Sequence, residues 1–246
     1  ETSCSSQRGA LGAYLAGLGA PIDFVVCDSP GVCDTNANAF AFAAEYLRIP
    51  FYHLNYPQVL GDARSQAYHR VDYRALIAFV EAQAGRRLED ERLRRVLAEA
   101  DRQDTLLGEL EDMHTLVPTP LPPIYNLFIY AGRFLFSGMP EYTRLLEAMH
   151  TRTRDRAEAG TSGLRSGREK LRAFMCYIDH YTLNLRFWDW LDERGIAHMG
   201  SILSGTFRDQ HGYAAGLPDA AYTIDMTDRN TLIDSMAQMN APAPMV

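Results

Sequence analysis

Hydrophobic positions in the first 57 residues follow the pattern of a strand, a helix and a second strand. The apolar, β-branched run at 22–27 predicts a buried strand, and residues 51–54 predict another that ends at Pro57. Between them, apolar residues at helical spacing predict a helix over 36–48, and a short helix is expected earlier, over 7–19. Two strands joined by a helix are expected to lie parallel in one sheet.

The middle of the chain is predicted to be helical. Residues 73–80 and 93–110 each place apolar side chains on one helix face, and the second stretch is rich in Arg and Glu. After four prolines between 118 and 123, residues 124–136 and 142–149 predict two more helices. The Gly- and Ser-containing segment 160–167 is the best candidate for a linker.

Alternation of strands and helices returns after this linker. Strands are predicted over 173–178, 196–203 and 221–226, and helices over 182–194 and 229–239. The fold class is therefore predicted to be α/β, with two Rossmann-like lobes that hold parallel sheets and a helical middle segment. The predicted segments are 1–57 for the first lobe, 58–165 for the helical part and 166–246 for the second lobe.

Composition narrows the class of protein. The chain has 246 residues, of which 47% are hydrophobic and 22% charged, so it can bury a sizeable core. A net charge of -7 without a basic block argues against nucleic acid as a partner. No apolar stretch reaches the roughly 20 residues that span a bilayer, so no membrane partner is expected and a cytoplasmic location is predicted. Because the chain opens on Glu1 and stops abruptly at Val246, both ends are expected to be missing, which leaves the second lobe incomplete.

Cysteines are the residues most able to carry chemistry. Three of the four lie within the first 33 positions, and Cys4 and Cys33 each lie a few residues before a predicted helix. Helix N-termini offer amide donors and a positive dipole end, which stabilise thiolates and the sulfides of a cluster. The spacing from Cys27 to Cys33 is not that of a zinc ribbon or a bacterial ferredoxin. Buried free thiols are the alternative, and they are the better interpretation for Cys27 and for Cys176.

The order of motifs in the first 57 residues resembles that of the 2-hydroxyacyl-CoA dehydratases and benzoyl-CoA reductases. The motifs are the segment 2–9, Thr-Ser-Cys-Ser-Ser-Gln-Arg-Gly, then the strand at 22–26, then Cys-Asp-Thr at 33–35, and finally Ile-Pro at 49–50 with Pro57. The second half is similar to this family in its strand, helix, glycine and strand that run toward Arg208. No motif for a dinucleotide or P-loop site is present in the sequence.

The resemblance implies that Cys4 and Cys33 are thiolate ligands of a [4Fe-4S] cluster, with Asp34 as a helix cap beside the second ligand. The family takes a third cysteine from the last part of the second lobe, where this sequence has none after Cys176. The third ligand could follow Val246, Cys27 or Cys176 could replace it, or this subunit could have lost its cluster. Each alternative remains open at the level of sequence.

The resemblance also implies the chemistry and the partners. An ATP-dependent iron–sulfur activator would deliver one electron, and reduction of a CoA thioester to a ketyl radical would then permit either 2-hydroxyacyl-CoA dehydration or benzoyl-CoA ring reduction. The enzyme would be oxygen-sensitive and heteromeric, with a homologous second subunit. Arg208 is the candidate for binding CoA, through a phosphate, while His53 and Tyr56 are candidates at the end of the second strand. The alternatives are a non-enzymatic two-lobed ligand-binding protein and a double-cluster reductase of a small molecule.

Overall fold

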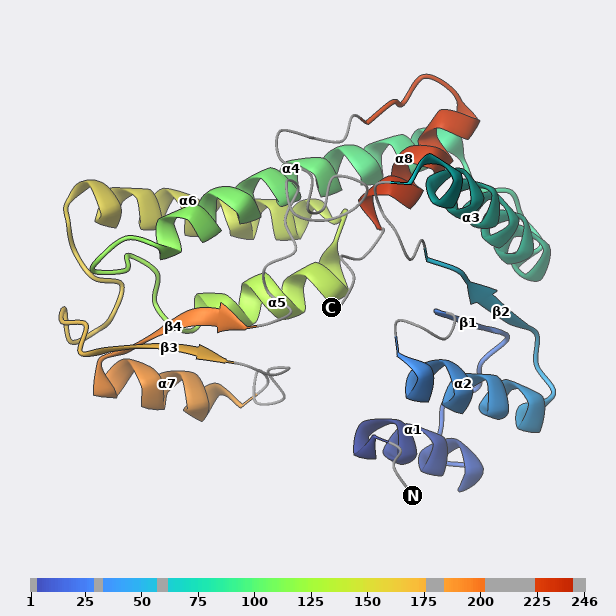
Figure 1. Ribbon diagram of the computed structural model, residues 1–246, viewed down its shortest axis with the longest axis horizontal. Coiled ribbons are helices and arrows are strands. Elements are labelled where there is room, and N and C mark those ends of the chain that lie inside the picture. The colour runs from blue at the N-terminus through green and yellow to red at the C-terminus, as the bar shows by residue number, and fades with distance from the viewer. Residues whose placement is uncertain (1–3, 29–32, 57–61, 176–183, 202–223, 241–246) are drawn as a thin grey trace. The chain divides into compact units, whose positions relative to one another are not determined.

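The computed structural model describes residues 4–28, 33–56, 62–175, 184–201 and 224–240, in which helices and short strands alternate (Figure 1). Contacts divide the chain into two compact units. The first unit contains Glu1–Asp90 and Gly212–Val246, and the second contains Glu91–His211. No helix in the described ranges is long and apolar enough to cross a membrane.

The first unit is built on a parallel pair of strands. Strands β1 (Val25–Asp28) and β2 (Phe51–Leu54) pair from Val25 beside Phe51 to Asp28 beside Leu54, with helix α2 (Asp34–Leu47) between them in sequence. Helix α1 (Ser5–Leu15) packs against α2. The predicted strand, helix and strand are thus confirmed, and both strands end at the same edge of the sheet.

Helix α3 (Ala63–Ala84) follows β2 and has clear signals at both ends. Asp62 caps its first turn, where Oδ2 accepts a hydrogen bond of 2.7 Å from the amide of Ser65. The helix ends at Gly85, whose φ of 64° is a left-handed conformation that glycine adopts without a steric penalty. These two signals set the length of the helix against which β2 and the last helix of this unit pack.

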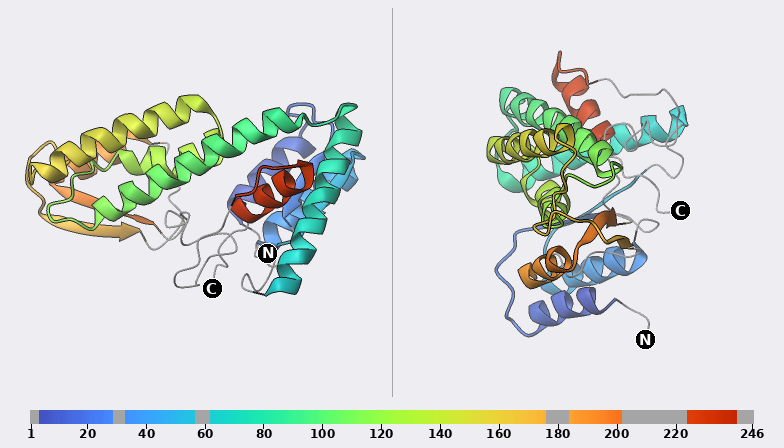
Figure 2. Two further views of the ribbon diagram at one scale, coloured as in Figure 1. Left: turned by 90° about the horizontal axis from the view of Figure 1, so that it is seen from above. Right: turned by 90° about the vertical axis from the view of Figure 1, so that its left-hand side faces the viewer.

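The last helix of the described chain, α8 (Arg229–Met239), packs on α3 although some 150 residues separate them in sequence, and the two views in Figure 2 agree on this. Arg229 donates to Glu81 at 2.6 Å and to Asp90 at 2.5 Å, and Arg74 pairs with Asp234 at 2.5 Å. The range of α8 agrees with the prediction for 229–239. The predicted segments were 1–57, 58–165 and 166–246. In the structure α8, from the third segment, packs on α3, from the second, and both belong to the same unit as the first segment.

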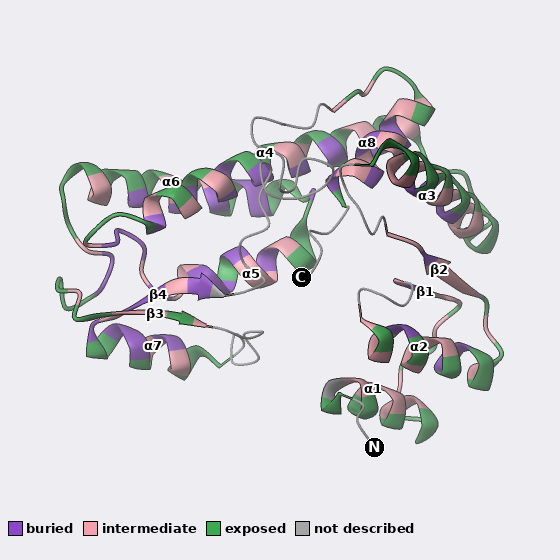
Figure 3. Ribbon diagram, in the orientation of Figure 1, coloured by how far each residue is buried: buried purple, intermediate pink, exposed green. Residues whose placement is uncertain are grey.

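The second unit is a helical layer with a small parallel sheet. Its helices are α4 (Asp90–His114), α5 (Tyr125–Phe136), α6 (Pro140–Glu158) and α7 (Leu185–Arg194), and its strands are β3 (Leu171–Met175) and β4 (Ile196–Ser201). The strands pair in parallel, with Leu171 beside Ile196. Figure 3 shows the buried sides of α4, α5 and α6 as purple stripes. Their apolar core consists of Leu106, Leu107, Leu110, Leu121, Ile129, Tyr142, Leu146 and Met149.

One buried amide joins α4 to the start of α6. The side chain of Gln103 is 2% exposed, and its Nε2 donates to the hydroxyl of Thr143 at 2.9 Å and to the carbonyl of Met139 at 3.0 Å. Its Oε1 accepts from the amide of Gly138 at 2.8 Å. Because a buried amide without partners is costly, this arrangement fixes how the two helices meet.

The predicted linker at 160–167 is irregular, as expected, but it is packed closely. Leu164 is only 3% exposed, and the amide of Gly163 donates to the carbonyl of Thr119 at 2.8 Å. A Cβ at Gly163 would lie 2.3 Å from the carbonyl carbon of Leu121, so only glycine fits against this backbone. The segment therefore anchors the proline-rich loop of the same unit.

The prediction of a mixed α/β fold with small parallel sheets is confirmed, and the two Rossmann-like lobes stay a prediction. One predicted strand is wrong where it can be compared. Residues 224–226 of the strand expected at 221–226 form no strand, because Asp225 instead exchanges two hydrogen bonds of 2.9 Å with the hydroxyl of Ser235 on α8. The rest of that strand, residues 221–223, lies outside the described residues.

Candidate functional site

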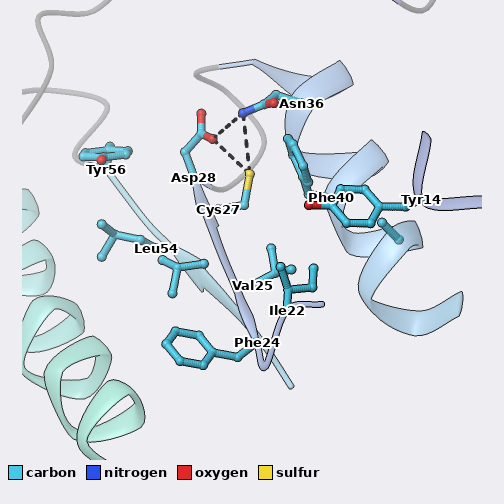
Figure 4. Close-up of a pocket in the computed structure, with 12 residues that line it drawn as sticks. Tyr14, Ile22, Phe24, Val25, Cys27, Asp28, Asn36, Phe40, Leu54 and Tyr56 are labelled. Atoms are coloured by element: carbon cyan, nitrogen blue, oxygen red, sulfur yellow. Dashed lines mark hydrogen bonds between the residues drawn. The ribbon is translucent and has the colours of Figure 1, made fainter. Parts of the chain in front are cut away.

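A pocket of about 550 Å³ in the first unit runs along β1, from Ile22 and Phe24 just before the strand to Asp28, and reaches the edge of the sheet at which β1 and β2 end (Figure 4). This is the edge at which open parallel sheets bind ligands, and the volume lies in the usual range for small-molecule sites. Its walls come from the two strands and from α1 and α2. The residues that line it are Tyr14, Ile22, Phe24, Val25, Val26, Cys27, Asp28, Asn36, Phe40, Ala43, Leu54 and Tyr56.

Three polar side chains meet at the end of β1. The thiol of Cys27 donates to Oδ1 of Asp28 at 3.2 Å, and Nδ2 of Asn36 on α2 donates to the same oxygen at 3.1 Å. Nδ2 also lies 3.6 Å from the sulfur of Cys27. Burial, together with this hydrogen bond and the charge of Asp28, raises the pKa of Cys27 to about 12. The thiol therefore stays neutral and acts as a hydrogen-bond donor.

Tyr56 lines the opposite side of the pocket and rests on α3. Burial raises its pKa to about 12, and the nearby charge of Asp28 adds to this effect. Its ring lies 5.4 Å from that of His69, which in turn lies 5.0 Å from the ring of Tyr73. His69 has no exposed surface, and burial lowers its pKa to about 4. The pocket is thus backed by the rings of Tyr56 and His69, both of which are neutral at pH 7.

Asp72 of α3 holds the end of β2 in place beside this pocket. Its Oδ1 accepts from the hydroxyl of Tyr52 at 2.7 Å, and its Oδ2 accepts from the amide of Asn55 at 2.7 Å and from the side chain of Asn55 at 3.1 Å. Hydrogen bonds to a charged acceptor are among the stronger ones. The backbone just before Tyr56 is therefore fixed relative to α3.

The two predicted cluster ligands occupy equivalent places on neighbouring helices. Cys4 directly precedes α1 and Cys33 directly precedes α2, each as the residue at the N-terminal cap, and α1 packs against α2. Neither side chain makes a capping hydrogen bond to its helix. Cys4 is exposed and Cys33 is half-buried. The prediction that Asp34 caps α2 is wrong, because Cys33 occupies the cap position and Asp34 is the first helical residue.

The described residues contain three thiols, Cys4, Cys27 and Cys33, and no complete metal site. Among them, no group of three or more His, Cys, Asp and Glu side chains could hold a metal ion. The thiol of Cys27 is neutral and donates to Asp28. Cys176 and Arg208, the residues considered at the sequence level as a third ligand and as a contact to CoA, lie outside the described residues.

The two candidates at the end of β2 have different surroundings. Tyr56 lines the pocket, whereas His53 does not, and the ring of His53 packs edge-on against Phe51 at 4.4 Å. Asp28 and Asn36 were missed by the reading of the sequence. The signal that could have pointed to Asp28 is the Cys-Asp pair at the carboxyl end of the predicted buried strand, where open parallel sheets bind ligands.

A pocket that reaches the carboxyl ends of two parallel strands defines an α/β protein with a candidate small-ligand site in its first unit. Two cysteines of the same unit stand at helix N-termini. Comparison with known families is consistent with this class. The family model described as 2-hydroxyglutaryl-CoA dehydratase, D-component, matches residues 1–243, and the chain belongs to this family. No curated protein matched the chain.

Membership in this family confirms the resemblance to the dehydratases. The chain is a component of a CoA-thioester dehydratase and works with other subunits of that system. The expectations of an iron–sulfur cluster, of a benzoyl-CoA reductase activity and of the roles of Cys4, Cys33 and Arg208 stay predictions.

Proposed function

We propose that this chain is the cluster-bearing subunit of an enzyme that dehydrates 2-hydroxyacyl-CoA thioesters. The observation that carries the proposal is the matched placement of Cys4 and Cys33 at the N-termini of two packed helices. Each thiol lies where free backbone amides and the helix dipole stabilise negative charge. In this proposal both thiolates hold a [4Fe-4S] cluster, and a third ligand comes from outside the described residues, with Cys176 as one candidate.

When bound, the cluster would supply one low-potential electron for reduction of the thioester carbonyl to the ketyl radical that precedes loss of the 2-hydroxyl group. The helix N-termini of α1 and α2 would keep the ligating thiolates deprotonated. An ATP-dependent iron–sulfur activator and a homologous second subunit are the proposed partners, Arg208 is the proposed contact to CoA, and the cytoplasm is the proposed location. Reduction of benzoyl-CoA is the competing activity within the same proposal.

The test is metal content after anaerobic purification of the full chain. Wild-type protein is expected to be brown, with iron and sulfide in equal amounts, and Cys4→Ser and Cys33→Ser are expected to lose most of both. Cys27→Ser is the matched control, because a serine hydroxyl can still donate to Asp28 and the residue is not a proposed ligand. Colourless, iron-free wild-type protein would overturn the proposal, as would equal loss of iron in the Cys27 variant.

Turnover then separates the two activities. With activator, ATP and a reductant, the assembled enzyme is expected to dehydrate a 2-hydroxyacyl-CoA thioester and to leave benzoyl-CoA unchanged. Reduction of the aromatic ring at a comparable rate would contradict the assignment as a dehydratase.

A further inference from the structure

The charge of the strand-end pocket is negative. Asp28 is the one ionisable carboxyl group among its described lining residues, and none of these residues is Lys, Arg or His. A ligand that carried its own carboxylate into this space would meet Asp28 without a compensating positive charge. Like charges a few ångströms apart at a partly buried site repel each other, which is expected to weaken binding by at least about tenfold, or about 1.4 kcal/mol.

The carboxylate of Asp28 is oriented for one further hydrogen bond. Figure 4 shows that the donors from Cys27 and Asn36 both end at the same oxygen, Oδ1. Within the part of the chain that the structure describes, Oδ2 receives no hydrogen bond. Cys27 and Asn36 come from different elements, β1 and α2, so the carboxylate is held between them with Oδ2 available to a ligand that donates.

The remaining wall of the pocket is apolar. Ile22, Phe24, Val25, Phe40 and Leu54 line it, and the thiol of Cys27 is neutral. An aliphatic chain placed there gains from the removal of apolar surface from water, at about 25 cal/mol per Å². The pocket therefore combines a surface for hydrocarbon with a single acceptor for a hydroxyl group.

We propose that this pocket holds the acyl group of the thioester, and that this group is an uncharged 2-hydroxyacyl chain whose hydroxyl donates to Oδ2 of Asp28. The inference rests on the proposed function in taking a CoA thioester as the ligand. The inference goes beyond the proposed function in naming the acyl group. The glutaryl group in the family's description ends in a second carboxylate, and the charge of Asp28 disfavours such a group in this pocket. Asp28 is thus the residue that selects the substrate.

The test is binding of three thioesters to the purified full chain by isothermal titration calorimetry. 2-Hydroxybutyryl-CoA is expected to bind roughly tenfold more tightly than butyryl-CoA, which lacks the donor, and at least about tenfold more tightly than 2-hydroxyglutaryl-CoA. In Asp28→Asn the charge is removed while an oxygen remains to accept from Cys27 and Asn36. Both differences are expected to shrink to a small factor in this variant.

Asp23→Asn is the matched control, since it removes an equal charge five positions earlier, at an exposed residue outside the pocket lining. It is expected to leave both differences unchanged. A second measurement needs no variant: 2-hydroxybutyryl-CoA should shift the amide resonances of Cys27, Asp28 and Asn36 in wild-type protein, relative to CoA alone. Shifts confined to other residues would overturn the proposal. Tight binding of 2-hydroxyglutaryl-CoA would also overturn it, as would a failure of all three thioesters to bind.

These outcomes are independent of the cluster. Selective binding by protein that never holds iron would keep the inference about the acyl group and overturn the cluster proposal. Iron-containing protein that binds all three thioesters equally would keep the cluster proposal and overturn the inference about the acyl group.

Discussion

The imidazole of His69 has no exposed surface and lies between the rings of Tyr56 and Tyr73. Burial lowers its pKa to about 4, whereas an unfolded histidine has a pKa of about 6.5. Between these two values the unfolded chain binds a proton that the folded chain does not. The stability that this residue contributes is therefore fully present above about pH 6.5 and is lost as the pH falls toward 4.

His69→Phe keeps an aromatic ring at this position and removes the titration. Between pH 7 and pH 4 the free energy of unfolding of the wild type is expected to fall by on the order of 3 kcal/mol more than that of the variant. Urea denaturation at a series of pH values measures both curves. Parallel curves for the two proteins would show that His69 does not titrate as its burial requires.

Individual residues were predictable from the sequence only where a local rule applied. Cys4 and Cys33 precede helices as expected, and Cys27 is buried at a strand end, as its apolar neighbours indicated. The pair formed by Asp28 and Asn36 depends on how α2 packs over β1, which no spacing rule encodes. The cap position at Cys33 was missed because an aspartate is the usual cap and stands one residue later.

Among the elements, α8 shows what local patterns cannot provide. Its bounds follow from helical periodicity and from the cap at Asp228, which accepts from the amides of Asn230 and Thr231. Its partner is set by Arg229, which reaches Glu81 and Asp90 across more than a hundred residues of chain. The range of the helix was therefore predictable, and its place on α3 was not.

Arg229→Gln is expected to loosen α8 from α3. Amide hydrogens of α8 should exchange roughly tenfold faster than in the wild type, because several hydrogen bonds to charged or carbonyl acceptors are lost at one point. Arg144→Gln is a matched control that breaks an exposed pair with Glu141 on α6, and it should have little effect. Exchange in α8 that does not differ between the two variants would contradict the role of Arg229.

On the scale of the whole molecule, the apolar cores of the two units differ in composition. The second unit has a continuous cluster of large side chains around Leu107, Leu110 and Leu146, all 1% exposed or less. The core of the first unit combines small residues such as Ala43, which lines its pocket, with large ones such as Leu232. Periodicity in the sequence predicted the helices that form the core of the second unit, since amphipathic stripes mark the buried face. The grouping of residues 1–90 with 212–246 required long-range contacts.

Leu146→Ala is expected to lower the free energy of unfolding by about 3 kcal/mol, because it leaves a cavity in the core of the second unit. Leu145→Ala is the neighbouring control at a side chain that is 39% exposed, where a loss below about 1 kcal/mol is expected. Denaturation monitored by circular dichroism measures both. Equal losses in the two variants would mean that the cluster is not the core that holds this unit.

The carboxylate of Asp72 supports the strand-end pocket from outside the residues that line it. It ties the backbone at Asn55 to α3, so the ring of Tyr56 keeps its distance from Asp28 when the pocket is empty. A cavity that is already shaped before binding has less conformational entropy to lose when it is filled. In the proposed acyl site, a change in ligand preference can therefore begin at position 72, through altered spacing of the walls, without a change in any residue that lines the pocket.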